Sequence, residues 1–313
     1  MTVSRVIKGT GGVGPSTRER VLRIAEELNY TANLAARALA TGKTGVVAIM
    51  SGGLNQYYYA SIVHLLESQL RTSGYQMRLL HTESDLKDVI SSTNAAVVDG
   101  VIIAGQHYVV EDFRSLEPYV LPPYIFIDTL AHTGTDHVHS NLRPAVREAL
   151  ELMAQKGSNR VAYVAHFGGV SSSAMVEERM SMYLSFMEGK GWPSELIGID
   201  WEVPLRQDTL KSYLEERGCP DALLCVNDET AMYVYRTLRD VGYRIPDDVL
   251  LVGCDGLPFM ECFDPPLSTI AQPLEEICAR AWEFLQARIA NPDLPIQQAT
   301  FDAQLVIRKS LQS

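Results

Sequence analysis

The chain lacks several features that would place it outside the cytoplasm. Its 313 residues contain no run of about 18 consecutive apolar residues, the length that a membrane-spanning helix needs. No apolar segment of a secretory signal follows Met1. The five cysteines form no C-x-x-C pair, which argues against a disulfide framework or a cysteine metal site. The sequence therefore predicts a cytoplasmic protein with reduced thiols and no contact with a membrane.

Catalytic signatures are also missing. The sequence has no G-x-S-x-G elbow, no Walker phosphate loop and no H-E-x-x-H helix. Its seven histidines are dispersed, and the alternating pair His137 and His139 is more typical of solvated side chains than of a metal site. We therefore predict a protein that is not an enzyme and that needs no metal or cofactor.

Positive charge is scarce overall but is gathered at one end. The net charge is −11, yet residues 1–43 hold seven basic and three acidic residues, a net charge of +4. The remaining 20 basic and 35 acidic residues give the rest of the chain a net charge of −15. A basic head on an acidic body is typical of a protein whose terminal module binds nucleic acid. The phosphates of DNA attract the basic head and repel the acidic body, which confines contact to the head.

From Val46 onward, apolar strands alternate with amphipathic helices. The predicted strands are Val46–Met50, Gln76–Leu80, Gly100–Ala104, Tyr124–Asp128, Val161–His166, Ala222–Asn227 and Val249–Gly253. The predicted helices are Tyr58–Thr72, Ala145–Lys156, Val176–Gly189, Thr209–Arg217, Glu229–Val241 and Glu275–Ile289. Apolar strands separated by such helices indicate an α/β protein with parallel sheets covered on both faces, and their number favours two lobes.

Polar residues follow four of the predicted strands. Ser51, Asp128, Asn227 and Asp255 each stand where a strand ends, and ligands of α/β proteins bind at the carboxyl ends of strands. Each residue alone is equally compatible with a helix cap or a turn. Four of them at one edge would form a binding site for a small polar ligand.

The head has its own helical pattern. A short apolar helix end precedes a glycine-rich turn, and then Ser16 or Thr17 is placed to cap an amphipathic helix over Arg18–Leu28, with Glu19 as the capping-box partner. A small, alanine-rich helix is expected over Asn33–Ala40.

These residues resemble the DNA-binding headpiece of the lactose repressor (LacI/GalR) family of bacterial transcription regulators. The strongest block joins Val3–Ile7, Thr17–Val21 and Leu28–Tyr30. Later segments resemble the family's effector domain: Phe126–Asp128, Glu178-Arg179, Val226–Asp228, Val252–Gly256, Pro266–Gln272 and Leu305–Arg308. The resemblance implies a repressor with a helix-turn-helix headpiece and two periplasmic-binding-protein-like lobes that close on a small effector.

The resemblance also implies DNA contacts. On matching positions, Thr2, Ser4 and Arg5 lie in the recognition helix, where Arg5 would contact a base or a phosphate. Asn33, Arg37 and Leu39 fall in the hinge helix. Leu39 would be an apolar wedge in the minor groove of operator DNA, and paired hinge helices imply a homodimer. A leucine exposed on a tethered helix is the plainer alternative for Leu39.

For the effector, the resemblance implies hydrogen bonds to a sugar or purine. Asp128, Arg179, Asn227 and Asp255 match the family's ligand positions and supply the donors and acceptors that hydroxyl-rich molecules need. Ser51, Tyr57, Trp201 and Gln272 are further candidates, and Tyr57 with its neighbours Tyr58 and Tyr59 could offer a flat apolar surface to a sugar ring, although Trp201 is as readily a core residue. We expect the effector to shift the equilibrium between lobe arrangements and so to change DNA affinity.

The predicted division of the chain follows from this resemblance. Residues 1–44 are a partial headpiece and hinge, residues 45–143 and 272–297 the first lobe, and residues 144–271 and 298–313 the second. No counterpart of the headpiece's first helix precedes Met1, so either Met1 is internal to a longer protein or the headpiece is naturally short. The second reading leaves an alternative function, an intracellular small-molecule receptor that has lost DNA binding.

Overall fold

The computed structural model describes residues 2–7, 11–27, 43–80, 98–105, 122–128, 134–166, 177–199 and 203–312. In the head, α1 (Thr2–Ile7) contacts α2 (Pro15–Glu27), and the side chain of Val6 is buried. The predicted cap of α2 is wrong by about one turn. The helix begins at Pro15, because proline fits the first helical position, and Arg18 N–H donates to the Gly14 carbonyl.

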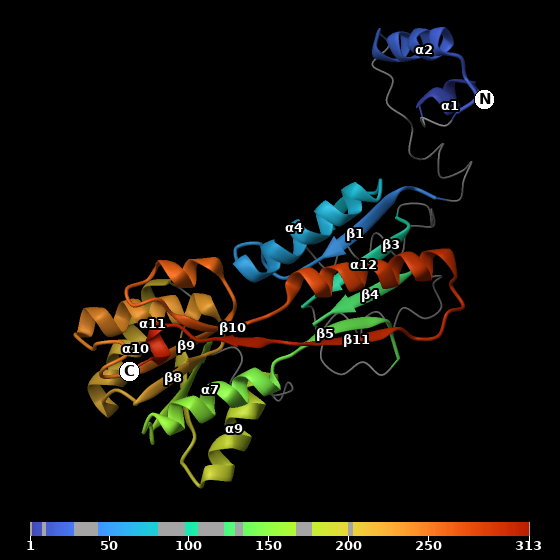
Figure 1. The fold of residues 1–313 in the computed structure, drawn as a ribbon. Helices are drawn as coiled ribbons and strands as arrows, with labels where there is room; N and C mark the ends of the chain where they lie inside the picture. The colour runs from blue at the N-terminus through green and yellow to red at the C-terminus, as the bar shows by residue number, and fades with distance from the viewer. Residues whose placement is uncertain are drawn as a thin grey trace.

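The first lobe is built on a six-stranded, wholly parallel sheet in the order β11-β5-β4-β3-β1-β2. Its strands are β1 (Val46–Met50), β2 (Gln76–Leu80), β3 (Gly100–Ala104), β4 (Tyr124–Ile127), β5 (His137–Asn141) and β11 (Gln298–Asp302). Two helices, α4 (Tyr57–Thr72) and α12 (Leu274–Ala290), lie side by side against one face (Figure 1). The core strands are apolar on both faces because both are covered.

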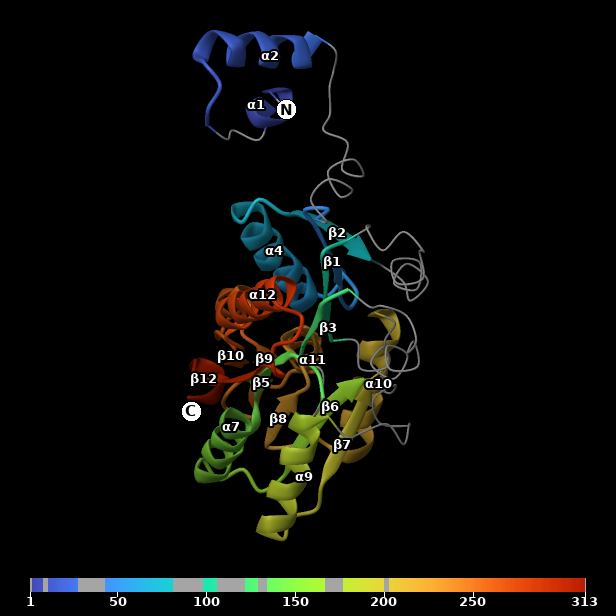
Figure 2. The same cartoon turned by 90° about the vertical axis from the view of Figure 1, so that its right-hand side faces the viewer.

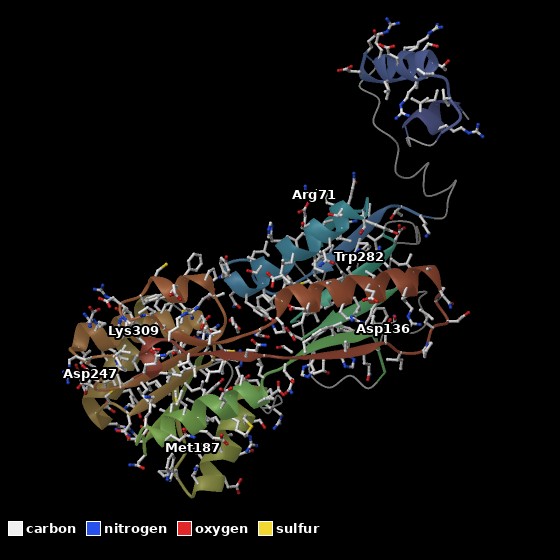
Figure 3. The ribbon with its side chains drawn as sticks, in the orientation of Figure 1. Arg71, Asp136, Met187, Asp247, Trp282 and Lys309 are labelled. Carbon is white, nitrogen blue, oxygen red and sulfur yellow. The ribbon has the colours of Figure 1, made fainter. Side chains whose placement is uncertain are left out.

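The second lobe repeats this plan with the strand order β12-β10-β9-β8-β6-β7. Its strands are β6 (Val161–His166), β7 (Glu195–Ile199), β8 (Ala222–Cys225), β9 (Leu250–Asp255), β10 (Ser268–Ala271) and β12 (Gln304–Val306), of which β12 is antiparallel to β10. One core lies under α7 (Arg143–Gln155) and α9 (Glu178–Lys190). Met187, on α9, is one of its buried side chains (Figure 3). The other lies under α10 (Val203–Arg217) and α11 (Asp228–Val241). Two 3-10 turns complete this lobe, η1 (Pro258–Cys262) and η2 (Lys309–Leu311).

The chain crosses between the lobes three times, and the lobes lie end to end in both views (Figures 1 and 2). The first crossing joins β5 to α7, the second joins β10 to α12, and the third joins β11 to β12. The predicted division placed residues 298–302 in the second lobe. That assignment is wrong, because β11 pairs in parallel with β5 of the first sheet, Gln298 opposite His137. The third crossing therefore falls at Ala303.

A buried ion pair holds the end of the first sheet. Asp136, at the entrance to β5, accepts hydrogen bonds from the guanidinium of Arg288 on α12 at 2.8 and 2.9 Å (Figure 3). Burial raises the pKa of Asp136, but hydrogen bonds from Arg288 and Gln297 outweigh it, and the net pKa is lowered. Of the helices in the described ranges, none combines the length and the apolar character that a membrane span requires.

Candidate functional site

Between the two lobes lies a cavity of about 180 Å³. It is lined by five residues that the sequence proposed for the effector: Asp128, Arg179, Asn227, Asp255 and Gln272. Their elements come from both lobes and from the second crossing, as expected for the carboxyl ends of parallel strands. Two tyrosines of the predicted cluster, Tyr58 and Tyr59, also line the cavity. Further lining residues were not predicted, among them Gln56, His139, Ser140 and Glu177.

The second lobe supplies the charged side of the cavity. Arg179, in the first turn of α9, donates from Nε to Glu177 Oε2 at 2.7 Å, and its Nη1 lies 3.9 Å from Asp255 Oδ1. Burial acts against the charges of both Arg179 and Glu177. The pKa of Glu177 is nevertheless lowered, because the Arg179 charge and hydrogen bonds from Tyr163 and the backbone stabilise the carboxylate. Glu177 thereby holds the guanidinium in place beside Asp255.

Glu177 could have been found from the sequence as a cap. It stands directly before α9, and its side chain accepts hydrogen bonds from the backbone N–H groups of Arg179 and Met180. A carboxylate at this position is favoured by the free N–H groups and the dipole of the helix.

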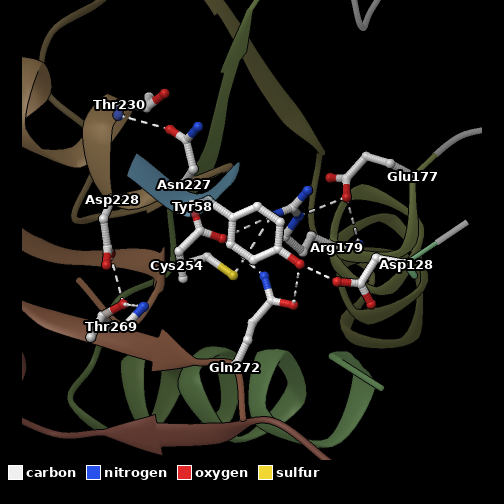
Figure 4. Close-up of polar contacts among 12 residues, drawn as sticks. Tyr58, Asp128, Glu177, Arg179, Asn227, Asp228, Thr230, Cys254, Thr269 and Gln272 are labelled. Carbon is white, nitrogen blue, oxygen red and sulfur yellow. Dashed lines mark hydrogen bonds and ion pairs between the residues drawn. The ribbon is translucent and has the colours of Figure 1, made fainter. Parts of the chain in front are cut away.

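Asn227 has both of the roles that its sequence position allowed. Its side-chain oxygen accepts from Thr230 N–H at 2.8 Å and caps α11, and the residue also lines the cavity (Figure 4). Asp228 is the first residue of the helix and is fully buried. It accepts from Leu257 N–H and Thr269 Oγ1, and burial raises its pKa to about 6. Asp228 therefore ties α11 to β10 and to the segment that follows β9.

The backbone is strained at two carboxylates that line the cavity, one from each lobe. Asp128 has φ 49° and Asp255 has φ 121°, and they are the two non-glycine residues with positive φ in the described part of the chain. Such conformations are uncommon outside glycine and cluster at ligand sites. Asp255 is the last residue of β9, and burial raises its pKa well above the usual range, against the opposing charge of Arg179.

Side chains of the first lobe complete the polar surface (Figure 4). The hydroxyl of Tyr58, on α4, donates to Asp128 Oδ2, while Ser140 N–H donates to Asp128 Oδ1 at 2.8 Å. Gln272, at the second crossing, donates to Asp255 Oδ1 at 2.9 Å, and its oxygen lies 3.4 Å from the Tyr58 hydroxyl. Gln272 thus links polar groups of both lobes.

Two of the predicted effector residues within the described part of the chain, Ser51 and Tyr57, are not among those lining this cavity. Ser51 donates to the Gly52 carbonyl nearby. Tyr57 lies on the outer surface, where its ring meets Phe259 edge-on at 5.0 Å between centroids. Its neighbour Tyr58 points into the cavity instead. The sequence of three consecutive tyrosines does not show which of them faces the cavity. Trp201 lies outside the described residues.

The predicted DNA contacts are only partly described. Thr2, Ser4 and Arg5 belong to α1, and the side chain of Arg5 is exposed. The hinge residues Asn33, Arg37 and Leu39 fall outside the described residues. No group of three or more metal-binding side chains was found within the described ranges.

Comparisons with known proteins agree with this geometry. A family description for bacterial regulatory proteins of the lacI family matches residues 1–33, and one for a periplasmic binding protein-like domain matches residues 150–311. The chain belongs to the lacI family of bacterial regulatory proteins. The ribose operon repressor of Halalkalibacterium halodurans is 24% identical over 99% of this chain and 92% of its own.

Solved structures of two regulators show the same fold. The lac repressor dimer bound to operator and the anti-inducer ONPF is 23% identical, covers 100% of this chain and 95% of its own, and superposes with a TM-score of 0.80. The transcriptional regulator CelR in complex with cellobiose is 24% identical, with coverage of 98% and 94% and a TM-score of 0.72. In this lacI-family chain, the cavity between the lobes therefore occupies a fold shared with ligand-bound regulators.

Proposed function

We propose that the chain is a transcriptional repressor whose affinity for operator DNA is set by a sugar bound between its lobes. One observation carries the effector half: polar side chains from both lobes and from a crossing converge on a single cavity, in a chain whose head matches the lacI family. A ligand that contacts both lobes changes their relative stability, and only such a differential interaction can shift a conformational equilibrium.

The charges of the cavity favour a neutral, hydroxyl-rich effector. Asp128, Glu177, Glu178 and Asp255 line it with Arg179 as their cationic neighbour. An anionic ligand would lie among carboxylates, whereas hydroxyl groups can donate to carboxylates and accept from the guanidinium and amide. The ribose operon repressor and the cellobiose-bound regulator provide sugars as comparable cases. Within this site we assign ligand contacts to Asp128, Arg179, Asn227, Asp255 and Gln272.

For DNA we assign the contacts to Thr2, Ser4 and Arg5 of α1 and to the hinge residues Asn33, Arg37 and Leu39. The working unit is a homodimer in the cytoplasm, as a twofold operator requires two headpieces. The apolar side chains that Leu54, Tyr57 and Phe259 expose on one outer surface support self-association. The role is binding without chemistry.

A salt-titrated DNA-binding assay tests this function. The DNA is taken from the promoter region of the chain's own gene, with and without D-ribose, cellobiose or lactose, for this chain and for a form extended by the codons upstream. Tight binding that weakens steeply with salt and changes with one sugar is the expected result. Arg5→Ala should reduce the salt slope by about one, while Lys309→Ala, an exposed charge in the second lobe (Figure 3), should not.

Absence of DNA binding in both forms, together with retained sugar binding, would favour the receptor function over the repressor. DNA binding that ignores every sugar would refute the sugar assignment but not the repressor. Arg179→Ala should keep DNA binding and lose the sugar response.

A further inference from the structure

Tyr58 lines the effector cavity, and its ring packs against the apolar core of the first lobe while its hydroxyl reaches the polar side of the cavity. Its ring stands among the polar side chains in Figure 4, between Asp128 on one side and Arg179 behind. Its hydroxyl donates to Asp128 Oδ2 and approaches Gln272 Oε1 at 3.4 Å. A phenol in this position combines an apolar ring with a hydroxyl donor, the two features by which a sugar face would be recognised.

The neighbouring tyrosine, Tyr59, is held by tight packing against the backbone. The ring of Tyr59 packs so closely on Gly52 and Gly105 that an added Cβ at either glycine would lie within 2.3 and 2.4 Å of it. Tyr59 is therefore held by backbone on both sides. Tyr58 meets Tyr59 edge-on at 5.3 Å, while its hydroxyl is held by side-chain oxygens.

The contact with Asp128 uses a carboxylate that the effector needs. One oxygen of Asp128 accepts from the Ser140 backbone N–H, so the other is the oxygen best placed to accept from a ligand, and Tyr58 donates to that one. Burial, followed by the Asp128 charge, raises the pKa of Tyr58 well above its usual range, so the phenol keeps its proton and remains a donor.

The same contact continues across the cavity. The Tyr58 hydroxyl has one proton, which it donates to Asp128, and Gln272 Oε1 lies beside it at 3.4 Å as a weaker second acceptor. Gln272 in turn donates to Asp255 Oδ1 at 2.9 Å, and that oxygen lies 3.9 Å from Arg179 Nη1. These contacts start in the first lobe and end in the second. Groups linked in this way hold the lobes at one spacing, because separating the lobes breaks at least one contact.

We propose that Tyr58 is an internal competitor of the effector: its hydroxyl holds the place of a ligand hydroxyl on Asp128, and the effector binds by displacing it. The inference rests on the proposed function and adds its regulation. Tyr58 lies in the first turn of α4, directly after Tyr57, whose backbone N–H donates to Glu229 of the second lobe at 2.8 Å and whose ring meets Phe259. Displacing the Tyr58 side chain from the cavity therefore disturbs the contacts that the adjacent Tyr57 makes with Glu229 and Phe259 of the second lobe.

The direct test is the affinity of Tyr58→Phe for D-ribose, cellobiose and lactose, measured by calorimetry. Phenylalanine keeps the ring and removes the competing hydroxyl. Because the sugar then no longer displaces a hydrogen bond to a charged group, a sugar that binds the wild type should bind this variant on the order of ten-fold more tightly. The matched control is Tyr235→Phe, which removes a hydroxyl that donates to the Asp264 carbonyl away from the cavity and should leave affinity unchanged.

A second variant tests occupancy without knowledge of the natural effector. Tyr58→Ala leaves a ring-sized space beside Asp128, and such spaces bind aromatic molecules of matching size. Phenol should raise the thermal midpoint of Tyr58→Ala but not that of the wild type. Adding Asp128→Ala to that variant should weaken phenol binding, because the hydroxyl loses its acceptor.

The outcomes separate the inference from the proposed function. A sugar that binds Tyr58→Phe equally well or more weakly than the wild type overturns the inference, since the hydroxyl is then neutral or part of the ligand contacts. If no sugar binds the wild type but phenol binds Tyr58→Ala, occupancy by Tyr58 stands and the sugar assignment fails. If phenol also fails to bind, both are refuted.

Discussion

Replacing Arg179 by alanine should show how much the Arg179–Glu177 ion pair contributes to the free energy of unfolding. The guanidinium is about four-fifths shielded from solvent and pairs with Glu177 at 2.7 Å. Removing one partner of a buried pair costs about 3–5 kcal/mol, and partial exposure of Glu177 reduces this. We expect Arg179→Ala to lower the free energy of unfolding by about 2–3 kcal/mol at neutral pH. The matched control, Arg236→Ala, breaks an exposed pair and should cost at most about 0.5 kcal/mol.

The cost should depend on pH in a defined direction. The folded-state pKa of Glu177 is lowered from 4.5, mainly by Arg179 once burial is overcome. The stability that this pair contributes is therefore present above pH 4.5 and is lost as the pH falls through the lower, folded-state value. Urea unfolding of wild type and variant at pH 7 and below pH 4 should show the difference shrinking at the acid end.

A double-mutant cycle identifies the cause. If the loss comes from a stranded carboxylate, Glu177→Gln in the Arg179→Ala background should recover part of it. Sugar affinity should fall separately, by about 1.5–3 kcal/mol, through the lost charge-assisted bond. An unfolding free energy within about 0.5 kcal/mol of the wild type, or no recovery on adding Glu177→Gln, would refute this account of the pair.

Three further predictions concern the surrounding framework. The pKa of Asp228 is raised to about 6, so the stability contributed by its proton is lost as the pH rises from about 4 to 6. Over this range the free energy of unfolding of the wild type, measured in urea, should fall relative to that of Asp228→Asn by up to about 3 kcal/mol. Parallel pH profiles of the two proteins would contradict this. Gly105→Ala should cost about 3 kcal/mol, because its Cβ would meet Tyr59 at 2.4 Å, whereas Gly191→Ala, with the same φ of 66° and open space, should cost only the backbone strain of about 1 kcal/mol; equal losses in thermal unfolding would exclude the steric cause. Asp136→Asn should lower the free energy of unfolding by about 3 kcal/mol, because it leaves a guanidinium without its charged partner, and a calorimetric loss below about 1 kcal/mol would disprove that.

Most of the strands that the sequence predicted have side chains that are apolar on both faces, and the edge strand Gln76–Leu80, with exposed Gln76 and Arg78, is an exception. Val46–Met50 and Val161–His166 were placed correctly to the residue, because their continuous apolar runs match strands covered on two sides. The edge strand β11 and its neighbour β5 were missed as strands. Their alternating, partly polar sequences, QATFD and HVHSN, lack the run that marks a buried strand.

At the candidate site, the polar strand ends could be predicted but the directions of side chains could not. Asp128, Asn227 and Asp255 came from the rule that strand ends of parallel sheets meet. Tyr57 was chosen over Tyr58, since a run of three tyrosines at a helix start does not show which one faces inward. Glu177 escaped notice because its role depends on the place where α9 begins.

The placement of β11 and α12 in the first sheet has a consequence for synthesis on the ribosome. The helices α1 and α2 are complete once residue 27 has emerged, but the first lobe also needs residues 274–302 and the second lobe needs residues 304–306. Neither sensor lobe can finish folding until nearly the whole chain is made, so these sheets close by contacts between distant segments, which form slowly. In a nascent chain, part of the DNA-binding head is therefore complete well before the effector cavity between the lobes can form.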